Sequence, residues 1–217
     1  MINTILVPQG AEYQAVCRGL KDIAPQPSVL PIPIGITPAT NYLQKWQQNQ
    51  PLPQRVLVVG LCGSLSPDYE VGNIVLYEEC LDLSGKRKKC DRILTNQLQQ
   101  HLSQEIPIVK SLTSDRPICS AQEKQQLALS SQADVVDMEG LAILTKLPTK
   151  IAMLRVISDD CTHNLPDLST AISSEGALLS WPLTLAMLRQ PLAAVRLIGG
   201  SLRSLRVLEE AIASLHL

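Results

Sequence analysis

Two acidic segments of the chain could supply catalytic side chains. The first is an apolar run that ends in Met138-Glu139, and the second, about one strand–helix unit later, ends in Ser158-Asp159. Each run is typical of a strand, and the carboxyl ends of parallel strands meet at the edge of the sheet where ligands bind. We therefore expect Glu139 and Asp159 to face one crevice. Two carboxylates in one pocket favour acid–base chemistry or the binding of a hydroxyl-rich ligand.

Each of these carboxylates also has a structural interpretation, which the sequence leaves open. Glu139 would begin a helix, where a negative charge compensates the helix dipole by about 0.3–1 kcal/mol. Asp159 and Asp160 would equally suit N-terminal caps of an irregular segment. Glu12, which follows the first strand, and His163, in a loop near Asp159, are more typical of solvated surface residues.

A glycine-rich segment, Gly60-Leu61-Cys62-Gly63-Ser64, follows a buried strand. We interpret it as a tight turn, whose amides could bind an anion or a sugar oxygen, although a plain turn is an equal alternative. It lacks the Gly-Lys-Ser/Thr of a phosphate-binding loop and the spacing of a dinucleotide fingerprint. Arg155 lies within an apolar strand. Because a buried arginine needs a partner, we expect it to pair with a carboxylate as structural support.

The composition predicts one domain and argues against nucleic acid, metal ions and a membrane span. The chain has 217 residues and a net charge of −1, with no basic stripe, which argues against nucleic acid. Residues 86–89, the densest basic run, are interpreted as a solvated hairpin tip. Six cysteines form no CxxC pair and no Cys/His cluster of zinc spacing, so we expect neither a metal nor another cofactor. The first residues lack the regions of a signal peptide, and no apolar run reaches the roughly 18 residues of a membrane span. We therefore predict a cytoplasmic protein with free, mostly buried thiols.

These side chains must be positioned by strands that alternate with helices. We expect strands at 2–7, 28–34, 55–59, 72–80, 106–112, 133–138 and 151–157. We expect helices at 12–20, 40–48, 93–102, 121–130 and 139–146. Pro31 and Pro33 favour either a sheet edge or an irregular form for the second strand. The pattern predicts a single α/β domain over 1–217, a mostly parallel mixed sheet with helices on both faces. Residues 170–217 form a helical C-terminal segment, with breaks near Pro182, Pro191 and the Gly199-Gly200 pair.

Three motifs in this order make the chain resemble the purine nucleoside phosphorylase and nucleosidase superfamily, across essentially its whole length. They are Val58–Leu65 followed by Val71-Gly72-Asn73-Ile74-Val75, then Met138-Glu139, then Ile157-Ser158-Asp159. Two branches of the superfamily are close. One is the methylthioadenosine/S-adenosylhomocysteine nucleosidases, and the other is the hopanoid-associated phosphorylase-like proteins. Residues 114–118, Glu123-Lys124 and the Leu/Arg-rich tail from 181 to 208 are similar to the second branch.

The resemblance implies cleavage of the bond between ribose and a purine, through an oxocarbenium-like state. It implies that Met138 packs against the sugar and that Glu139 accepts hydrogen bonds from ribose hydroxyls. Asp159, oriented by Ser158, would deliver or hold a proton at the purine N7, and such an acid needs the raised pKa that a dry pocket supplies. Glu12 would orient and deprotonate the attacking water.

Departures from the family pattern bear on the nucleophile. Phosphorylases of the superfamily commonly bind phosphate with an Arg just before the glycine-rich turn and a Ser within it. Here Val58-Val59 precedes the turn, and Leu61 stands where the Ser would be. An apolar side chain cannot satisfy phosphate oxygens, which favours water. Gly63 and Ser64 remain as substrate-binding residues, with Ser64 as a substitute for the missing serine.

A second departure concerns the purine. The nucleosidases stack it on a Phe, whereas this chain has no Phe and carries Asp115-Arg116-Pro117-Ile118 at that place. Arg116 or Pro117 would cover the base less tightly, and Ile118 is counted among the substrate-binding residues.

We therefore predict a nucleosidase that uses water to cleave a small purine nucleoside, such as methylthioadenosine or S-adenosylhomocysteine. Two alternatives remain: a purine nucleoside phosphorylase, including one for an adenosylhopane-type substrate, and a nucleoside-binding protein that has lost turnover. Relatives are commonly oligomers, so the resemblance implies a homo-oligomer, most simply a dimer. The apolar tail has room for a partner surface, though core packing explains it equally well.

Overall fold

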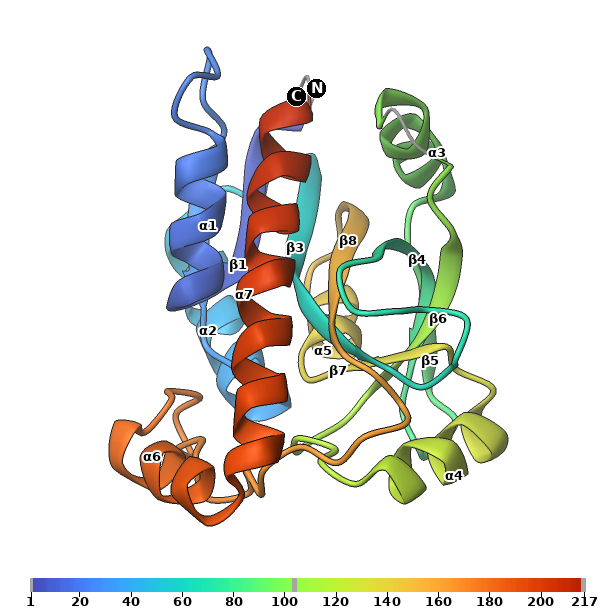
Figure 1. Ribbon diagram of the computed structural model, residues 1–217. Coiled ribbons are helices and arrows are strands. Elements are labelled where there is room, and N and C mark those ends of the chain that lie inside the picture. Colours follow the sequence, from blue (N-terminus) through green and yellow to red (C-terminus); the bar gives the residue numbers. More distant parts are fainter. Residues whose placement is uncertain (1, 103–104, 216–217) are drawn as a thin grey trace.

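The computed structural model of the protein describes residues 2–102 and 105–215 (Figure 1). Within these residues, eight strands form one mixed sheet with seven helices around it. The strands are β1 (Thr4–Pro8), β2 (Ser28–Ile32), β3 (Arg55–Ser64), β4 (Ile74–Leu81), β5 (Arg87–Lys89), β6 (Ile108–Thr113), β7 (Val135–Asp137) and β8 (Lys150–Asp159). The helices are α1 (Ala11–Gly19), α2 (Ile36–Asn49), α3 (Arg92–His101), α4 (Ala121–Ser131), α5 (Gly140–Lys146), α6 (Ser180–Arg189) and α7 (Pro191–Ser214).

Five of the strands pair in a closed ring. β3 pairs with β8, β8 with β4, β4 with β6, β6 with β7, and β7 returns to the end of β3. β1 and β2 extend the sheet from β3, and β5 extends it from β4. Five of the eight pairings are parallel, so the predicted mostly parallel mixed sheet is confirmed. Of the two forms expected for the second strand, the edge position is confirmed, because β2 pairs only with β1 among the described strands.

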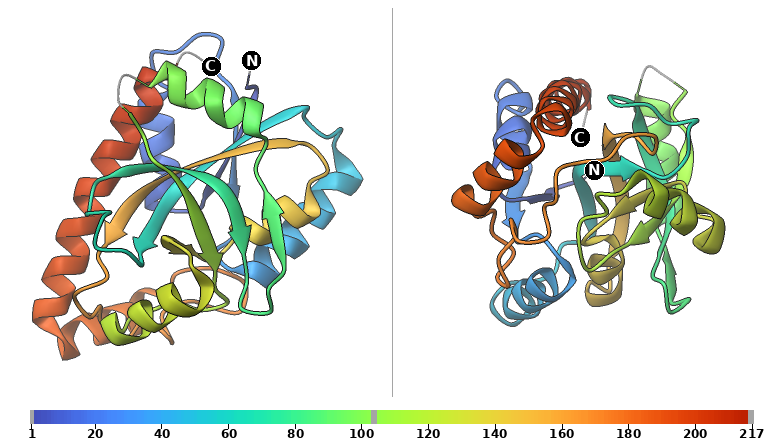
Figure 2. Two further views of the ribbon diagram at one scale, coloured as in Figure 1. Left: turned by 90° about the vertical axis from the view of Figure 1, so that its right-hand side faces the viewer. Right: turned by 60° about the horizontal axis from the view of Figure 1, so that its bottom comes forward.

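Alternation along the strands divides the core into two layers. Ile5 and Val7 of β1 point to one side, where α1, α3 and α7 pack, while Leu6 points to the other side, towards α2 and α5. This is the period of two that a strand imposes on its side chains. α1 and α7 lie side by side, on the opposite side of the sheet from α2 (Figures 1 and 2). The expectation of helices on both faces is therefore confirmed.

The expected tight turn at residues 60–64 is wrong. β3 continues to Ser64, because its parallel pairing with β8 runs on to Cys62. A bulge between Cys62 and Gly63 then bends the strand, and Gly63 and Ser64 pair with β7 in the antiparallel sense. The two glycines allow neighbouring side chains to approach the backbone of β3 closely, and they do not form a turn.

The C-terminal segment is helical only in part. Residues 170–179 are irregular, with a bridge between Ile172 and Leu178, and the first helix begins at Ser180. Pro182 does not break α6, since it lies in the first turn, where its missing N–H is not needed. The break near Pro191 is confirmed, with that proline opening α7. α7 runs through Gly199 and Gly200 without interruption, so the expected break there is wrong.

Several simpler expectations hold. The basic run at residues 86–89 lies in an exposed hairpin formed by β4 and β5, as predicted. The six cysteines are free, and four of them are buried. Across residues 2–102 and 105–215, none of the helices is long and apolar enough to cross a membrane.

Candidate active site

Glu139 lies where β7 gives way to α5, and its carboxylate points away from its own helix. It is the N-cap residue of α5, yet its side chain makes no capping hydrogen bond. Instead, Oε1 accepts a hydrogen bond of 2.9 Å from the backbone N–H of Gly35, at the start of α2. Glu139, which is 4 % exposed, therefore does not cap its own helix and binds the N-terminus of α2 instead.

Arg155 lies close to two carboxylates beneath the site. Its side chain is fully buried in β8, and Nη2 lies 3.7 Å from Glu139 Oε2 and 3.8 Å from Asp137 Oδ2. Asp137 is held in turn by Thr113 Oγ1, which donates at 2.8 Å, and by the N–H of Gly140. The expectation that Arg155 pairs with a carboxylate is confirmed. A buried guanidinium offsets the cost of burying neighbouring carboxylates, because its positive charge pairs with theirs.

Glu12 reaches the same cluster from α1. Its Oε1 accepts a hydrogen bond of 2.6 Å from the backbone N–H of Leu61. The glycine at position 60 makes this approach possible. A Cβ there would lie 2.2 Å from Arg155 Nη1 and 2.7 Å from Glu12 Oε1. The first glycine of the segment therefore leaves room for two charged groups.

Burial perturbs both glutamates of this cluster. It raises the pKa of Glu12 to about 7, an effect that Arg155 and the Leu61 N–H only partly offset. Burial likewise raises the pKa of Glu139 to about 7, against the charge of Arg155 and with repulsion from Asp137 and Glu12. Part of Glu12 is exposed, but its carboxyl group is enclosed, which is why burial dominates. A carboxylate with a pKa near neutrality is well suited to take up a proton in a reaction at pH 7.

Asp159, at the end of β8, is held on both oxygens. The ammonium of Lys124 in α4 forms an ion pair with Oδ1, and the Ser158 hydroxyl donates to Oδ2 at 2.7 Å. Lys124 Nζ also donates to the carbonyl of Asp160 at 2.7 Å. Gly63 again serves close approach, because a Cβ there would lie 2.9 Å from Asp159 Oδ1. The hydrogen bond from the Ser158 hydroxyl therefore orients the Asp159 carboxylate.

Asp160 and His163 form a separate loop structure. Asp160 Oδ1 accepts hydrogen bonds from the backbone N–H groups of Thr162 and His163, and His163 Nδ1 lies 3.0 Å away. Burial tends to raise the pKa of Asp160, but the hydrogen bonds from Thr162 and His163 outweigh it and lower the value to about 2. The capping interpretation therefore applies to Asp160 rather than to Asp159.

Glu12, Glu139 and Asp159 line one cavity of about 250 Å³. Of the sequence-predicted residues, the cavity is lined by Glu12, Gly63, Ile118, Met138, Glu139, Ser158 and Asp159. Ser64 is not among its lining residues. The Ser64 hydroxyl donates to the carbonyl of Ser66 at 2.6 Å and accepts from its N–H, so it stabilises the turn that follows β3. Leu61 lines the cavity with its apolar side chain, and Ser64 does not occupy its place.

Other lining residues were not singled out from the sequence. Leu165, Leu168 and Ile172, from the irregular segment before α6, and Leu197 of α7 give the cavity an apolar side. Lys124 was noted only as part of a family-like stretch. The sequence did offer a signal, because Lys124 shares a helix face with Leu127 and Ala128, where an apolar residue is expected. In the structure its side chain is fully buried.

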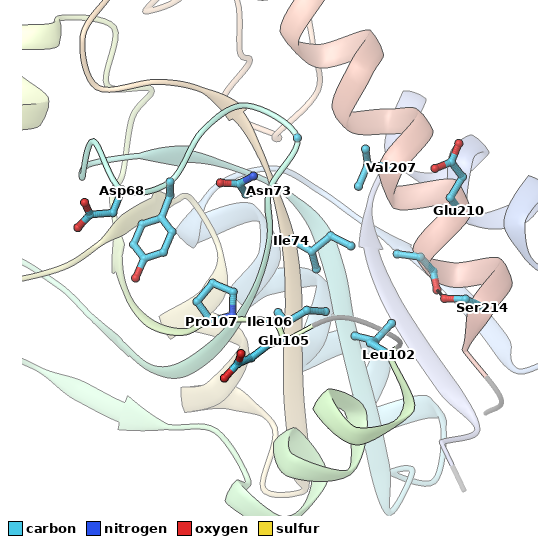
Figure 3. A pocket seen from close by; sticks show the side chains of 13 residues that line it. Asp68, Asn73, Ile74, Leu102, Glu105, Ile106, Pro107, Val207, Glu210 and Ser214 are labelled. Atoms are coloured by element: carbon cyan, nitrogen blue, oxygen red, sulfur yellow. Dashed lines mark hydrogen bonds between the residues drawn. The ribbon is translucent and has the colours of Figure 1, made fainter.

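A larger cavity, of about 570 Å³, lies elsewhere, between α7, the end of α3 and the segment before β4. Its carboxylates, Asp68, Glu105 and Glu210, come from three separate segments and do not converge (Figure 3). Size alone would not select the candidate site, because this cavity and one of about 610 Å³ beside Arg55 and Lys150 are both larger. The smaller one is the candidate active site, because the buried charges and perturbed carboxyl groups meet there.

One family of known proteins matches most of the chain. A sequence model described as the phosphorylase superfamily matches residues 27–176, which is more than half of the chain. The chain belongs to the phosphorylase superfamily. The matched region includes Leu61, Glu139 and Asp159 and excludes Glu12. The resemblance to enzymes that act on N-ribosyl bonds is thereby confirmed at the level of the family. No curated protein sequence matches the chain.

Solved structures share the fold of this phosphorylase-superfamily protein at low sequence identity. A Streptococcus pneumoniae MTA/SAH nucleosidase in complex with 8-aminoadenine is 15 % identical, with a TM-score of 0.69, over 99 % of this chain and 100 % of that chain. A futalosine hydrolase of Helicobacter pylori is 14 % identical, with a TM-score of 0.68, over 97 % of this chain and 95 % of that one. An H. pylori 5'-methylthioadenosine/S-adenosylhomocysteine nucleosidase is 15 % identical, with a TM-score of 0.66, over 96 % of this chain and 94 % of that one.

Proposed function

We propose that this protein is a nucleosidase that hydrolyses the N-glycosidic bond of a purine nucleoside, with adenine as the base. The observation that carries the proposal is the enclosed Glu12 carboxyl, with a pKa of about 7, in the same cavity as Glu139 and Asp159. Glu12 would deprotonate the attacking water, while Glu139 and Asp159 would bind the sugar and the purine in the same cavity. The reaction takes one nucleoside and one water and yields the free sugar and the free base.

Glu12 acts on the water. One of its oxygens is held by the Leu61 N–H, which fixes the direction of the carboxylate. When ionised, it accepts a proton from water as the oxygen attacks the anomeric carbon. Arg155 lies against the same group and limits the repulsion between Glu12 and Glu139. This arrangement keeps a basic carboxylate in a buried place.

Glu139 binds the sugar. Its Oε1 is occupied by the Gly35 N–H, and Oε2 faces Arg155 at 3.7 Å, so the carboxylate has a fixed orientation at the cavity wall. Ribose hydroxyls donate to it, and these bonds strengthen as positive charge grows on the ring. Met138, the preceding residue, supplies apolar contact to the sugar.

Asp159 acts on the base. Its carboxyl group, held between Lys124 and Ser158, delivers its proton to the purine N7 and is left as a carboxylate. Solvent restores this proton and takes up the one that Glu12 removes from water. A base that departs with this proton leaves as a neutral molecule, which lowers the barrier to bond cleavage. Ile118 and Pro117 line the same cavity and give the purine an apolar wall.

Water fits this cavity better than phosphate. Its polar groups include the carboxylates of Glu12, Glu139 and Asp159, which repel a dianion. Arg116 lines the cavity, but its guanidinium is paired with Glu123, at 2.5 Å. Leu61 adds an apolar surface where an anion would need donors.

One observation favours a second candidate, a nucleoside-binding protein without turnover. The ion pair of Asp159 with Lys124 competes for the carboxylate that the purine would use. A protein of this kind would bind a nucleoside and leave its glycosidic bond intact. We propose that a small purine nucleoside is the ligand in either case, and that the protein is a homodimer in the cytoplasm.

Release of free base separates these functions. Methylthioadenosine, S-adenosylhomocysteine, adenosine and inosine are incubated with the protein, with and without phosphate, and the free base is measured by chromatography. Hydrolysis predicts adenine without added phosphate. Adenine that forms only with phosphate would show phosphorolysis. Binding by calorimetry without any release of base would establish the second candidate.

A further inference from the structure

A band of exposed apolar side chains runs along α6 and the first half of α7. We define the α6–α7 apolar face by Trp181, Leu188, Leu192, Val195, Ile198 and Leu202. Trp181 is 77 % exposed and Leu192 is 78 % exposed, values expected of charged residues. Large apolar side chains gathered in this way on a surface mark a place of contact with a partner or a membrane.

Helical spacing gathers these side chains on one side of α7. Leu192, Val195 and Leu202 follow one another at intervals of three and seven residues, which keeps them on one face. Ala194, Leu208 and Ile212 of the same helix are buried, on the opposite face, towards the sheet and α1. α7 is thus apolar on both sides, and its own fold covers only one of them.

The charged side chains within the segment that carries this face are all positive. Residues 176–208 contain four arginines and no lysine, aspartate or glutamate, in a chain whose net charge is −1. The arginines are Arg189, Arg196, Arg203 and Arg206, and all four are exposed. None of them lies within 4.0 Å of a carboxylate in the described part of the chain. Arg196 and Arg203 directly follow Val195 and Leu202, so they border the apolar face.

We propose that the α6–α7 apolar face docks onto the surface of an anionic phospholipid bilayer. An apolar stripe edged by arginines, with a tryptophan at one end, matches the layered chemistry of a lipid surface. Leucine and valine enter the acyl boundary, while the guanidinium groups pair with lipid phosphates. A second copy of the chain fits less well, because two-fold pairing through this face would bring arginines together, with no acidic residue in the segment to pair with them.

The docking face adjoins the candidate active site. Leu197, between Val195 and Ile198 on α7, lines the cavity, as does Ile172 just before α6. The helix that meets the lipid surface therefore also forms a wall of the cavity. The inference itself does not depend on the proposed function, since it rests on exposure and charge alone.

Vesicle co-sedimentation tests the proposal. The full chain is mixed with vesicles of phosphatidylcholine alone, or of phosphatidylcholine and phosphatidylglycerol in equal parts. We expect binding to the anionic vesicles, weaker binding to the neutral ones, and loss of binding as salt is raised. Fluorescence of Trp181 should shift to shorter wavelength on binding. Equal binding to both vesicles, or binding to neither, would overturn the proposal.

Matched variants locate the contact. Leu188→Ser with Leu192→Ser should abolish binding, and Arg196→Gln with Arg203→Gln should weaken it by about tenfold or more. Leu83→Ser with Leu129→Ser is the control, because both leucines are highly exposed outside this face. Thermal unfolding checks that each variant folds. A dimer in lipid-free solution that is lost in the Leu188/Leu192 variant would assign the face to a second copy and overturn the proposal.

Discussion

Lys124 of α4 and Asp159 of β8 form an ion pair in which the lysine side chain is fully buried and the aspartate side chain is 13 % exposed. The pair ties the helix after β6 to the strand end that carries the candidate base-binding group. It also sets the direction of the Asp159 carboxylate, with Ser158 on its other oxygen. The base end of the cavity is therefore built by three side chains from two elements.

The first prediction concerns this pair. Lys124→Met should lower the free energy of unfolding by about 3–5 kcal/mol, because it leaves a largely buried carboxylate without its partner. Lys45→Met, at an exposed lysine, is the control. Urea unfolding measures both. The double variant Lys124→Met with Asp159→Leu should recover much of the loss, and absence of any recovery would mean that the two residues are not coupled.

The second prediction concerns the base for water. Glu12→Gln should lower kcat/KM by about 10²–10⁴ and leave nucleoside binding nearly unchanged. In the parent protein, kcat/KM should rise with pH up to about 7, because Glu12 is active when ionised and its pKa is about 7. The rise should be shallower in the variant, where Glu139, also with a pKa of about 7, still titrates. Glu70→Gln, at an exposed glutamate outside the cavity, is the control, and full activity in Glu12→Gln would remove the residue from the mechanism.

The third prediction concerns the sugar. Glu139→Gln should lower kcat/KM strongly for a ribonucleoside and far less for the same nucleoside without its 2'- or 3'-hydroxyl. A carboxylate accepts hydrogen bonds more strongly than an amide, and the difference disappears when the donor is absent. Values of kcat/KM for matched ribo- and deoxynucleosides, in the parent protein and the variant, measure the coupling between the Glu139 carboxylate and each hydroxyl. An equal loss on all substrates would point to a role in folding instead.

The fourth prediction concerns stability and pH. Glu12 and Glu139 have pKa values of about 7 in the folded protein, above the ordinary glutamate value of 4.5. The folded state therefore holds protons between these values that the unfolded state has released. This contribution to stability is complete below pH 4.5 and is lost as pH rises through 7, on the order of 3 kcal/mol for each group. Unfolding in urea at a series of pH values should show the fall, and Glu139→Gln should reduce it.

The fifth prediction uses two adjacent glycines of α7. A Cβ at Gly199 would meet no atom within 4 Å, whereas a Cβ at Gly200 would lie 2.4 Å from the carbonyl oxygen of Ser158. Gly199→Ala should stabilise the protein by about 0.5–1 kcal/mol through helix propensity. Gly200→Ala should destabilise it and disturb Ser158 next to Asp159. Similar unfolding temperatures for the two variants would contradict the packing of α7 on β8.

Much of the framework could be predicted because it depends on local patterns. The apolar runs and helical spacing placed most elements within a few residues, and strand ends bring Glu139 and Asp159 to one edge. Proline and glycine were harder to interpret. Pro182 is tolerated in a first turn, and Gly60 and Gly63 leave room for neighbouring charges, yet the same residue types also mark turns and breaks. Their meaning depends on what packs against them.

The sequence by itself determined the alternation of strands and helices, the family motifs and the residues at the strand ends, because neighbours in the chain control these features. Tertiary structure alone decided that five strands close into a ring and that Arg155 and Glu12 both lie against Gly60. It also decided that Lys124 reaches Asp159 and that Ser64 turns to Ser66 instead of the cavity. These contacts join residues whose distance depends on packing across the whole core, and no local pattern encodes that distance.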